Sequence, residues 1–141
     1  MSKREQFIRT QLLMLKATTT YMLRTLKEER FTILDEKDQL KQEFLNDEAE
    51  DFGLVMTVTT REKVHAISYR ILQDIRNWKI PKDSDVKRLR KLICIHMAQL
   101  CKMEAINLQT SKTFYFDMFE AVEQSVRWLK ILKEATDKHD E

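Results

Sequence analysis

Cysteine and histidine side chains are the usual ligands of structural zinc, and the segment LICIHMAQLCK (92–102) contains Cys94, His96 and Cys101. If this segment is a helix, the two thiols lie about 10.5 Å apart along its axis. One zinc ion, about 2.3 Å from each sulfur, cannot span that separation, and a disulfide needs Cα atoms within about 7 Å. We therefore expect neither a metal site nor a disulfide. Both cysteines should instead be buried beside an apolar stripe, and His96 should be a core or interface residue.

A second metal motif is suggested by Glu62 and His65, which have the E-x-x-H spacing of di-iron carboxylate bundles. That chemistry needs a second E-x-x-H and two further inward glutamates, and the sequence has no second copy. Glu62 is better explained as the capping partner of Thr59 at a helix start. Neither metal motif is therefore complete. The sequence also lacks a phosphate-binding glycine loop, a G-x-S-x-G elbow and a paired Cys/His arrangement. These absences predict a non-enzymatic protein without metal or cofactor.

The charge of the chain is strongly segregated. Residues 1–27 carry +5, residues 28–51 carry −7, residues 61–102 carry +7 and residues 103–141 carry −3, although the net charge is only +2. The basic segment could bind nucleic acid, and the residues predicted to do so are Lys82, Lys87, Arg88, Lys91 and Lys102. Its helices are too long for a typical helix-turn-helix reader. Cations near a helix N-terminus oppose the helix dipole, so KRLRK needs an anionic partner; we prefer the acidic segment 46–51 of the same chain over phosphate.

One Gly and one Pro in 141 residues leave few turn formers, which favours long helices over sheets. Apolar residues recur every three to four positions over most of the chain. We predict helices at about 3–30, 34–46, 60–78, 85–108 and 113–136, with an acidic loop at 46–53. A single bent helix from residue 3 to 46 is the alternative to the first two.

Several boundaries rest on local signals. LVMTVTT (54–60) is β-branched and predicts an extended segment packed on the bundle. Thr59 forms a capping box with Glu62 at the start of the helix predicted at 60–78. Pro81 ends that same helix, because proline cannot continue it. Asp83 or Ser84 should cap the next helix, and Thr110, Ser111 or Thr113 the last.

The apolar stripes predict which helix faces are buried. They comprise Ile8, Leu12, Leu15, Thr19, Met22 and Leu26; Val64, Ile67, Ile71, Ile75 and Trp78; Leu89, Ile93, Met97 and Leu100; and Phe114, Met118, Val122, Ser125, Leu129 and Leu132. On the polar face of the last helix, Glu123 and Arg127 stand four apart and should form an ion pair.

Five large apolar residues fall outside or beside these stripes: Tyr115, Phe116, Phe119, Ile95 and Ile106. Clustered exposed residues of this kind mark association surfaces. They form the predicted partner-binding set, and the alternative is that another helix of the bundle covers them.

The sequence therefore predicts an all-α single domain over residues 1–141, a four- or five-helix bundle with a long N-terminal helix or helical hairpin. The expected function is a non-enzymatic interaction module that binds and regulates or scaffolds a protein partner, with self-association as a homodimer. Nucleic-acid binding through 61–102 is the alternative. No apolar run is long enough for a membrane span or a signal peptide, and two cysteines so placed favour an intracellular location, cytoplasmic or nuclear.

Overall fold

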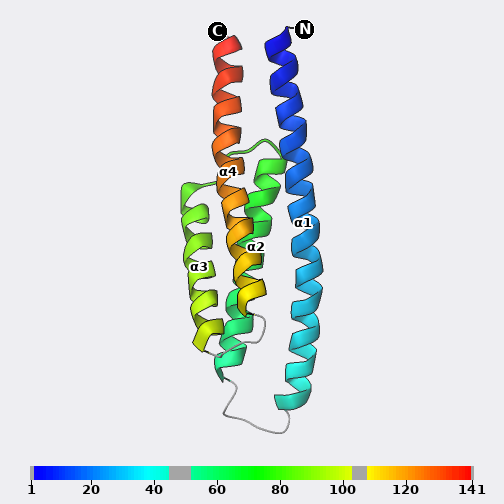
Figure 1. Ribbon diagram of the computed structural model, residues 1–141, viewed down its shortest axis with the longest axis vertical. Coiled ribbons are helices and arrows are strands. Elements are labelled where there is room, and N and C mark those ends of the chain that lie inside the picture. Colours follow the sequence, from blue (N-terminus) through cyan, green and yellow to red (C-terminus); the bar gives the residue numbers. More distant parts are fainter. Residues whose placement is uncertain (1, 45–51, 103–107, 141) are drawn as a thin grey trace.

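The computed structural model describes residues 2–44, 52–102 and 108–140, and the side chains of 2–28, 56–102 and 108–136. This part of the chain forms four packed helices and no strand: α1 (Lys3–Phe44), α2 (Phe52–Arg76), α3 (Asp83–Lys102) and α4 (Leu108–Asp140). Consecutive helices pack on one another, and α4 returns to α1, so that the first and last helices lie side by side (Figure 1). The predicted all-α bundle is confirmed, with four helices.

Helix α1 is one continuous helix of 42 residues, so the single-helix alternative is correct and the predicted division into helices at 3–30 and 34–46 is wrong. Ser2 caps its start, because the Glu5 amide donates to Ser2 Oγ at 3.1 Å and the Gln6 amide donates to the Ser2 carbonyl at 3.0 Å. Its threonines fit a helix because their hydroxyls donate to a carbonyl one turn back, as Thr10 Oγ1 does to Gln6 at 2.9 Å.

The prediction of an extended LVMTVTT segment is wrong, since α2 begins at Phe52 and includes it. Thr57 and Val58 are buried, so packing against the bundle outweighs β-propensity here. The capping box at Thr59 is also wrong, because its neighbour Thr60 is already helical and donates its hydroxyl to the Met56 carbonyl at 2.9 Å. Gly53 lies in the first turn of α2 rather than in a loop, and segment 46–51 lies outside the described residues.

The end of α2 is a Schellman motif built without glycine. The Lys79 amide donates to the Asp74 carbonyl at 2.8 Å, and the Trp78 amide donates to the Ile75 carbonyl at 3.0 Å. Trp78 itself takes the left-handed position, with φ of 61°, which costs about 1–2 kcal/mol in a residue with a Cβ. Its ring packs against the core, which offsets that cost.

Helix α3 begins at Asp83, close to the predicted cap, whereas α4 begins at Leu108, five residues before the predicted start. Thr110, Ser111 and Thr113 therefore lie inside α4 and cap nothing at its start. Ser and Thr favour caps, but the same residues are tolerated within a helix whose apolar face is buried.

The predicted stripes of all four helices contribute to the core, and in α1 the buried members are Leu15, Thr19, Met22 and Leu26, whereas Ile8 and Leu12 are half-buried. Leu89, Ile93, Val122, Ile71 and Leu129 are fully buried, and His96 joins them, as predicted. The predicted burial of Cys94 and Cys101 is wrong, because both are exposed free thiols. Each follows a buried stripe residue by one position, and that rotation of 100° carries it out of the core.

Candidate partner-binding groove

The five predicted partner-binding residues do not share one surface. Phe116 and Ile95 are exposed, with 40% and 39% of their surface accessible, whereas Tyr115 and Phe119 belong to the core. Ile106 lies outside the described residues. The alternative that the bundle itself covers some of these residues is therefore correct for Tyr115 and Phe119.

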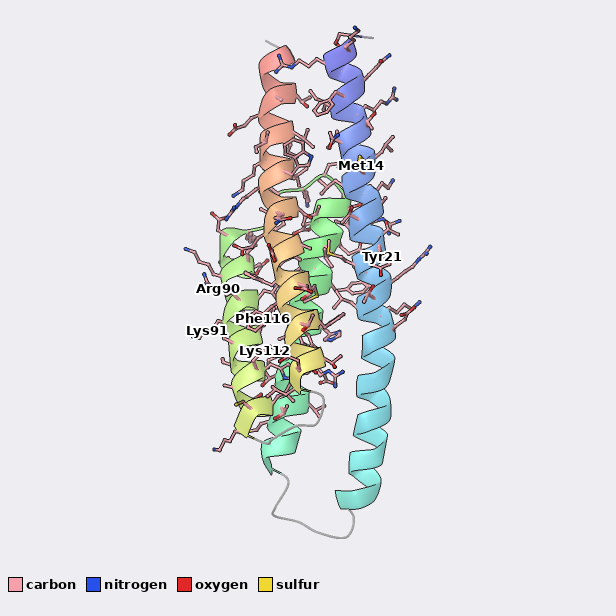
Figure 2. All side chains as sticks on the ribbon, in the orientation of Figure 1. Met14, Tyr21, Arg90, Lys91, Lys112 and Phe116 are labelled. Carbon is pink, nitrogen blue, oxygen red and sulfur yellow. The ribbon has the colours of Figure 1, made fainter. Side chains whose placement is uncertain are left out.

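Phe116 borders a groove that runs between α3 and α4. Two adjoining hollows of about 290 and 470 Å³ form it, and they share Arg90, Phe119, Glu123 and Arg127. Phe119 lines both hollows although it is largely buried, so it provides an apolar floor. Figure 2 shows Phe116 and Lys112 on α4 beside Arg90 and Lys91 on α3. Ile95 does not line this groove.

The groove is mainly basic. At one end Lys130 Nζ lies 3.4 Å from Asp83 Oδ1 and joins α4 to the first turn of α3. Farther along, Arg90 and Arg127 are not ion-paired with any carboxylate among the described side chains. The predicted Glu123–Arg127 pair does not form. The guanidinium groups of Arg90 and Arg127 are therefore available to an anionic ligand that enters the groove.

The five predicted nucleic-acid residues, Lys82, Lys87, Arg88, Lys91 and Lys102, are all exposed on or just before α3. A smaller hollow between α2 and α3 adds Lys63 and Arg70 to Arg88. Arg70 Nη2 lies 3.2 Å from Asp85 Oδ1. The expected conflict with the helix dipole is offset, because Asp83 and Asp85 occupy the first turn of α3 and the cations follow them.

The preferred pairing of KRLRK with segment 46–51 involves residues outside the described part of the chain. The described residue that follows that segment, Phe52, begins α2 at the end of the bundle opposite the start of α3 (Figure 1). The cations of α3 are exposed and available to a partner.

A buried polar cluster behind the groove fixes the orientation of α4. The Tyr115 hydroxyl accepts a hydrogen bond from Arg61 Nε at 3.1 Å and bonds His65 Nε2 at 2.9 Å. Its ring meets that of His96 edge-on, with centroids 5.1 Å apart. Since Tyr115 is held inward by α2 and α3, the next residue, Phe116, is turned toward solvent at the groove rim.

Burial, together with the positive charge of Arg61, lowers the pKa of His96 from 6.5 to about 4. His96 is thus a neutral imidazole at pH 7. His96 does not line the groove. The cluster of His96, Tyr115, Arg61 and His65 therefore orients α4 from inside the bundle and does not contact a ligand in the groove.

Sequence reasoning missed Arg90 and Arg127 as site residues. Arg90 stood within KRLRK but was left out of the predicted set, and Arg127 was assigned to an intrahelical pair. The signal that could have found them is their position: each directly follows a buried apolar residue, Leu89 or Val126, at the edge where α3 and α4 meet.

No group of three or more His, Cys, Asp or Glu side chains is arranged to hold a metal ion among the residues described. None of the described helices is long and apolar enough to cross a membrane. Comparisons with protein-family models, with curated proteins and with solved structures found no match.

Proposed function

We propose that the protein is a non-enzymatic interaction module whose α3/α4 groove binds an acidic, amphipathic segment of a partner protein. The observation that carries the proposal is the exposed ring of Phe116 beside Arg90 and Arg127, neither of which is paired with a described carboxylate. Aromatic and arginine side chains contribute most of the affinity at protein interfaces.

The groove supports recognition in two parts. An apolar side chain of the partner would cover Phe116 and the Phe119 floor, which removes apolar surface from water. Carboxylates on the same segment would accept paired hydrogen bonds from Arg90 and Arg127, whose planar guanidinium groups favour bidentate contacts. The first part supplies affinity, and the second fixes the orientation of the segment.

Binding is favoured over catalysis because of where the titratable groups lie. The groove holds exposed cations and a single carboxylate at its centre, Glu123. The buried histidine with a strongly lowered pKa, His96, stands behind the groove and not in it. General acid–base catalysis needs such a group within hydrogen-bond reach of the substrate.

Affinity capture with matched variants tests this function. Wild-type protein, Phe116→Glu, Arg127→Glu and Ile131→Glu serve as baits in nuclease-treated extract. Ile131 is a matched control because it is an exposed apolar residue on the same helix, outside the groove. We expect a protein retained by wild type and Ile131→Glu but lost with Phe116→Glu and with Arg127→Glu. Equal retention by all baits, with helicity unchanged in circular dichroism, would contradict the proposal.

Nucleic-acid binding is the second candidate, favoured by the three cations that line the α2/α3 hollow, Lys63, Arg70 and Arg88. Binding to mixed DNA or RNA would then weaken steeply with salt, because each phosphate contact releases counterions. The variant Lys63→Glu/Arg88→Glu should abolish it and leave partner capture intact. Absence of binding at low salt eliminates this candidate.

The exposed free thiols Cys94 and Cys101 support an intracellular site of action, cytoplasmic or nuclear. Accessible cysteines persist unpaired in reducing compartments and are oxidised or cross-linked in secretory ones.

Two copies of the chain joined through another face of the bundle would carry two α3/α4 grooves, which suits a scaffold.

A further inference from the structure

Helix α1 carries a second seven-residue repeat on the side that faces away from the bundle. Its core positions run through Leu15, Thr19, Met22 and Leu26, all of which are buried. A separate line of residues follows the spacing three, four, three, four of a coiled-coil seam, and every member is exposed. The members are Lys3, Phe7, Thr10, Met14, Ala17, Tyr21, Arg24 and Glu28.

The large apolar members of this outer seam are among the most exposed large apolar residues described. Phe7 is 54%, Met14 58% and Tyr21 71% accessible. Figure 2 shows Met14 and Tyr21 along α1 at the edge of the bundle. The Thr10 hydroxyl already donates to the Gln6 carbonyl at 2.9 Å, so covering Thr10 would leave no unpaired donor.

We propose that this outer seam binds a second copy of the chain, with the two α1 helices antiparallel. The seam alternates between d positions (Lys3, Thr10, Ala17 and Arg24) and a positions (Phe7, Met14, Tyr21 and Glu28) of the seven-residue repeat. In an antiparallel coiled coil, each a-position residue of one helix faces a d-position residue of the other. About a twofold axis between Met14 and Ala17, the layers join Phe7 with Arg24, Met14 with Ala17, Tyr21 with Thr10 and Glu28 with Lys3.

Each of these layers is complementary. The long Met14 side chain meets the small Ala17, and Tyr21 meets the short Thr10, so large and small residues alternate across the seam. Glu28 meets the opposite charge of Lys3, and the Arg24 guanidinium can lie over the Phe7 ring. A parallel pair would instead place Lys3, Arg24 and Glu28 each against its own copy, which is repulsive.

The size of the seam indicates a weak dimer. From Lys3 to Glu28 the helix is about 37 Å long, and a strip about 10 Å wide presents on the order of 400 Å² per copy. Stable complexes bury about 800 Å² per partner. We therefore expect a dissociation constant in the micromolar range or above, and self-association that depends on concentration within reach of ordinary measurements.

Sedimentation velocity on the full chain, diluted from about 1 mM to about 1 µM, tests this inference. Wild type should convert from dimer to monomer on dilution. Met14→Glu should weaken association at least tenfold, because it places a carboxylate at the centre of the apolar layers. Ile131→Glu and Phe116→Glu, which alter other exposed apolar surfaces, should leave association unchanged. Ala17→Glu provides a second reading if Met14→Glu loses helicity in circular dichroism.

The orientation is tested by charge exchange and by cross-linking. Lys3→Glu and Glu28→Lys should each weaken the dimer, and the double variant should restore it, since the opposite charges meet again. In a Cys94→Ser/Cys101→Ser background, a mixture of Phe7→Cys and Arg24→Cys proteins should cross-link through a short bismaleimide. Phe7→Cys alone should not, because its two copies would lie about 25 Å apart along the axis.

Three results would overturn the inference: a monomer at every concentration, a dimer indifferent to Met14→Glu and Ala17→Glu, or Phe7→Cys protein that cross-links efficiently to itself. None of them bears on the α3/α4 groove, because Phe116 and the residues around it stand on other helices.

Discussion

Acidification should destabilise the bundle through one residue, His96. Only 1% of its surface is accessible, and its pKa is lowered to about 4 from 6.5. A group whose folded pKa is depressed contributes stability that is fully present above its unfolded pKa and is lost as pH falls toward its folded pKa. For His96 that window runs from about pH 6.5 down to about pH 4.

The magnitude follows from the two pKa values. The difference between 6.5 and about 4 corresponds to a total of about 3 kcal/mol, at 1.36 kcal/mol for each pKa unit. Most of it, about 2 kcal/mol, should be lost between pH 7 and pH 5, where Asp and Glu side chains with ordinary pKa values remain largely ionised. Since the total stability of a small domain is about 5–15 kcal/mol, a loss of this size is readily measured.

Urea unfolding of wild type and His96→Phe at pH 7, 6 and 5 measures the effect. Phenylalanine keeps an aromatic ring beside Tyr115 and removes the titration, and the other histidines are the same in both proteins. The unfolding free energy of wild type should fall by about 2 kcal/mol more than that of His96→Phe over this range. As a reference for NMR titration, Ala98→His adds an exposed imidazole on the same helix. If the His96 imidazole titrates near 6.5 like that reference, or if both proteins lose equal stability, the reasoning fails.

Three further substitutions or labelling experiments test the packing. Tyr115→Phe removes the acceptor of the 3.1 Å hydrogen bond from Arg61 and should lower the unfolding free energy by about 1–3 kcal/mol, measured by urea denaturation. At Trp78, with φ of 61°, Gly should give a protein about 1 kcal/mol more stable than Ala, because only Gly adopts this backbone without strain; equal stability would argue against the left-handed cap. Cys94 and Cys101 should both react with Ellman's reagent in the folded protein, and protection of either until unfolding would contradict its exposure.

The core and the fold class could be predicted because they depend on periodicity. Buried residues such as Leu89, Ile93 and Val122 recur at helical spacing, and in a chain with one Gly and one Pro few alternatives to helices exist. The errors lie where local preference and tertiary packing disagree. LVMTVTT has a β-branched composition, but buried Thr57 and Val58 hold it in α2.

The site was only partly predictable for a related reason. That Phe116 is exposed and Tyr115 is buried depends on Arg61 and His65, which stand 54 and 50 residues away in the sequence. Helical periodicity within one element does not show which neighbour holds an aromatic side chain. The cations of α3 were recognised from their density alone, but their relation to Arg127 required the packing of α4.

The order in which the helices pack also has a consequence for folding kinetics. Each helix contacts the next one in the chain, so most native contacts join residues that are close in sequence, and topologies of low contact order fold in microseconds to milliseconds. The pairings of α4 with α1 and with α2 are exceptions, and the α1–α4 pairing joins the two ends of the chain and requires the largest loop to close. We expect that pairing to form after the rate-limiting barrier, so that destabilising substitutions along it accelerate unfolding and leave the refolding rate almost unchanged.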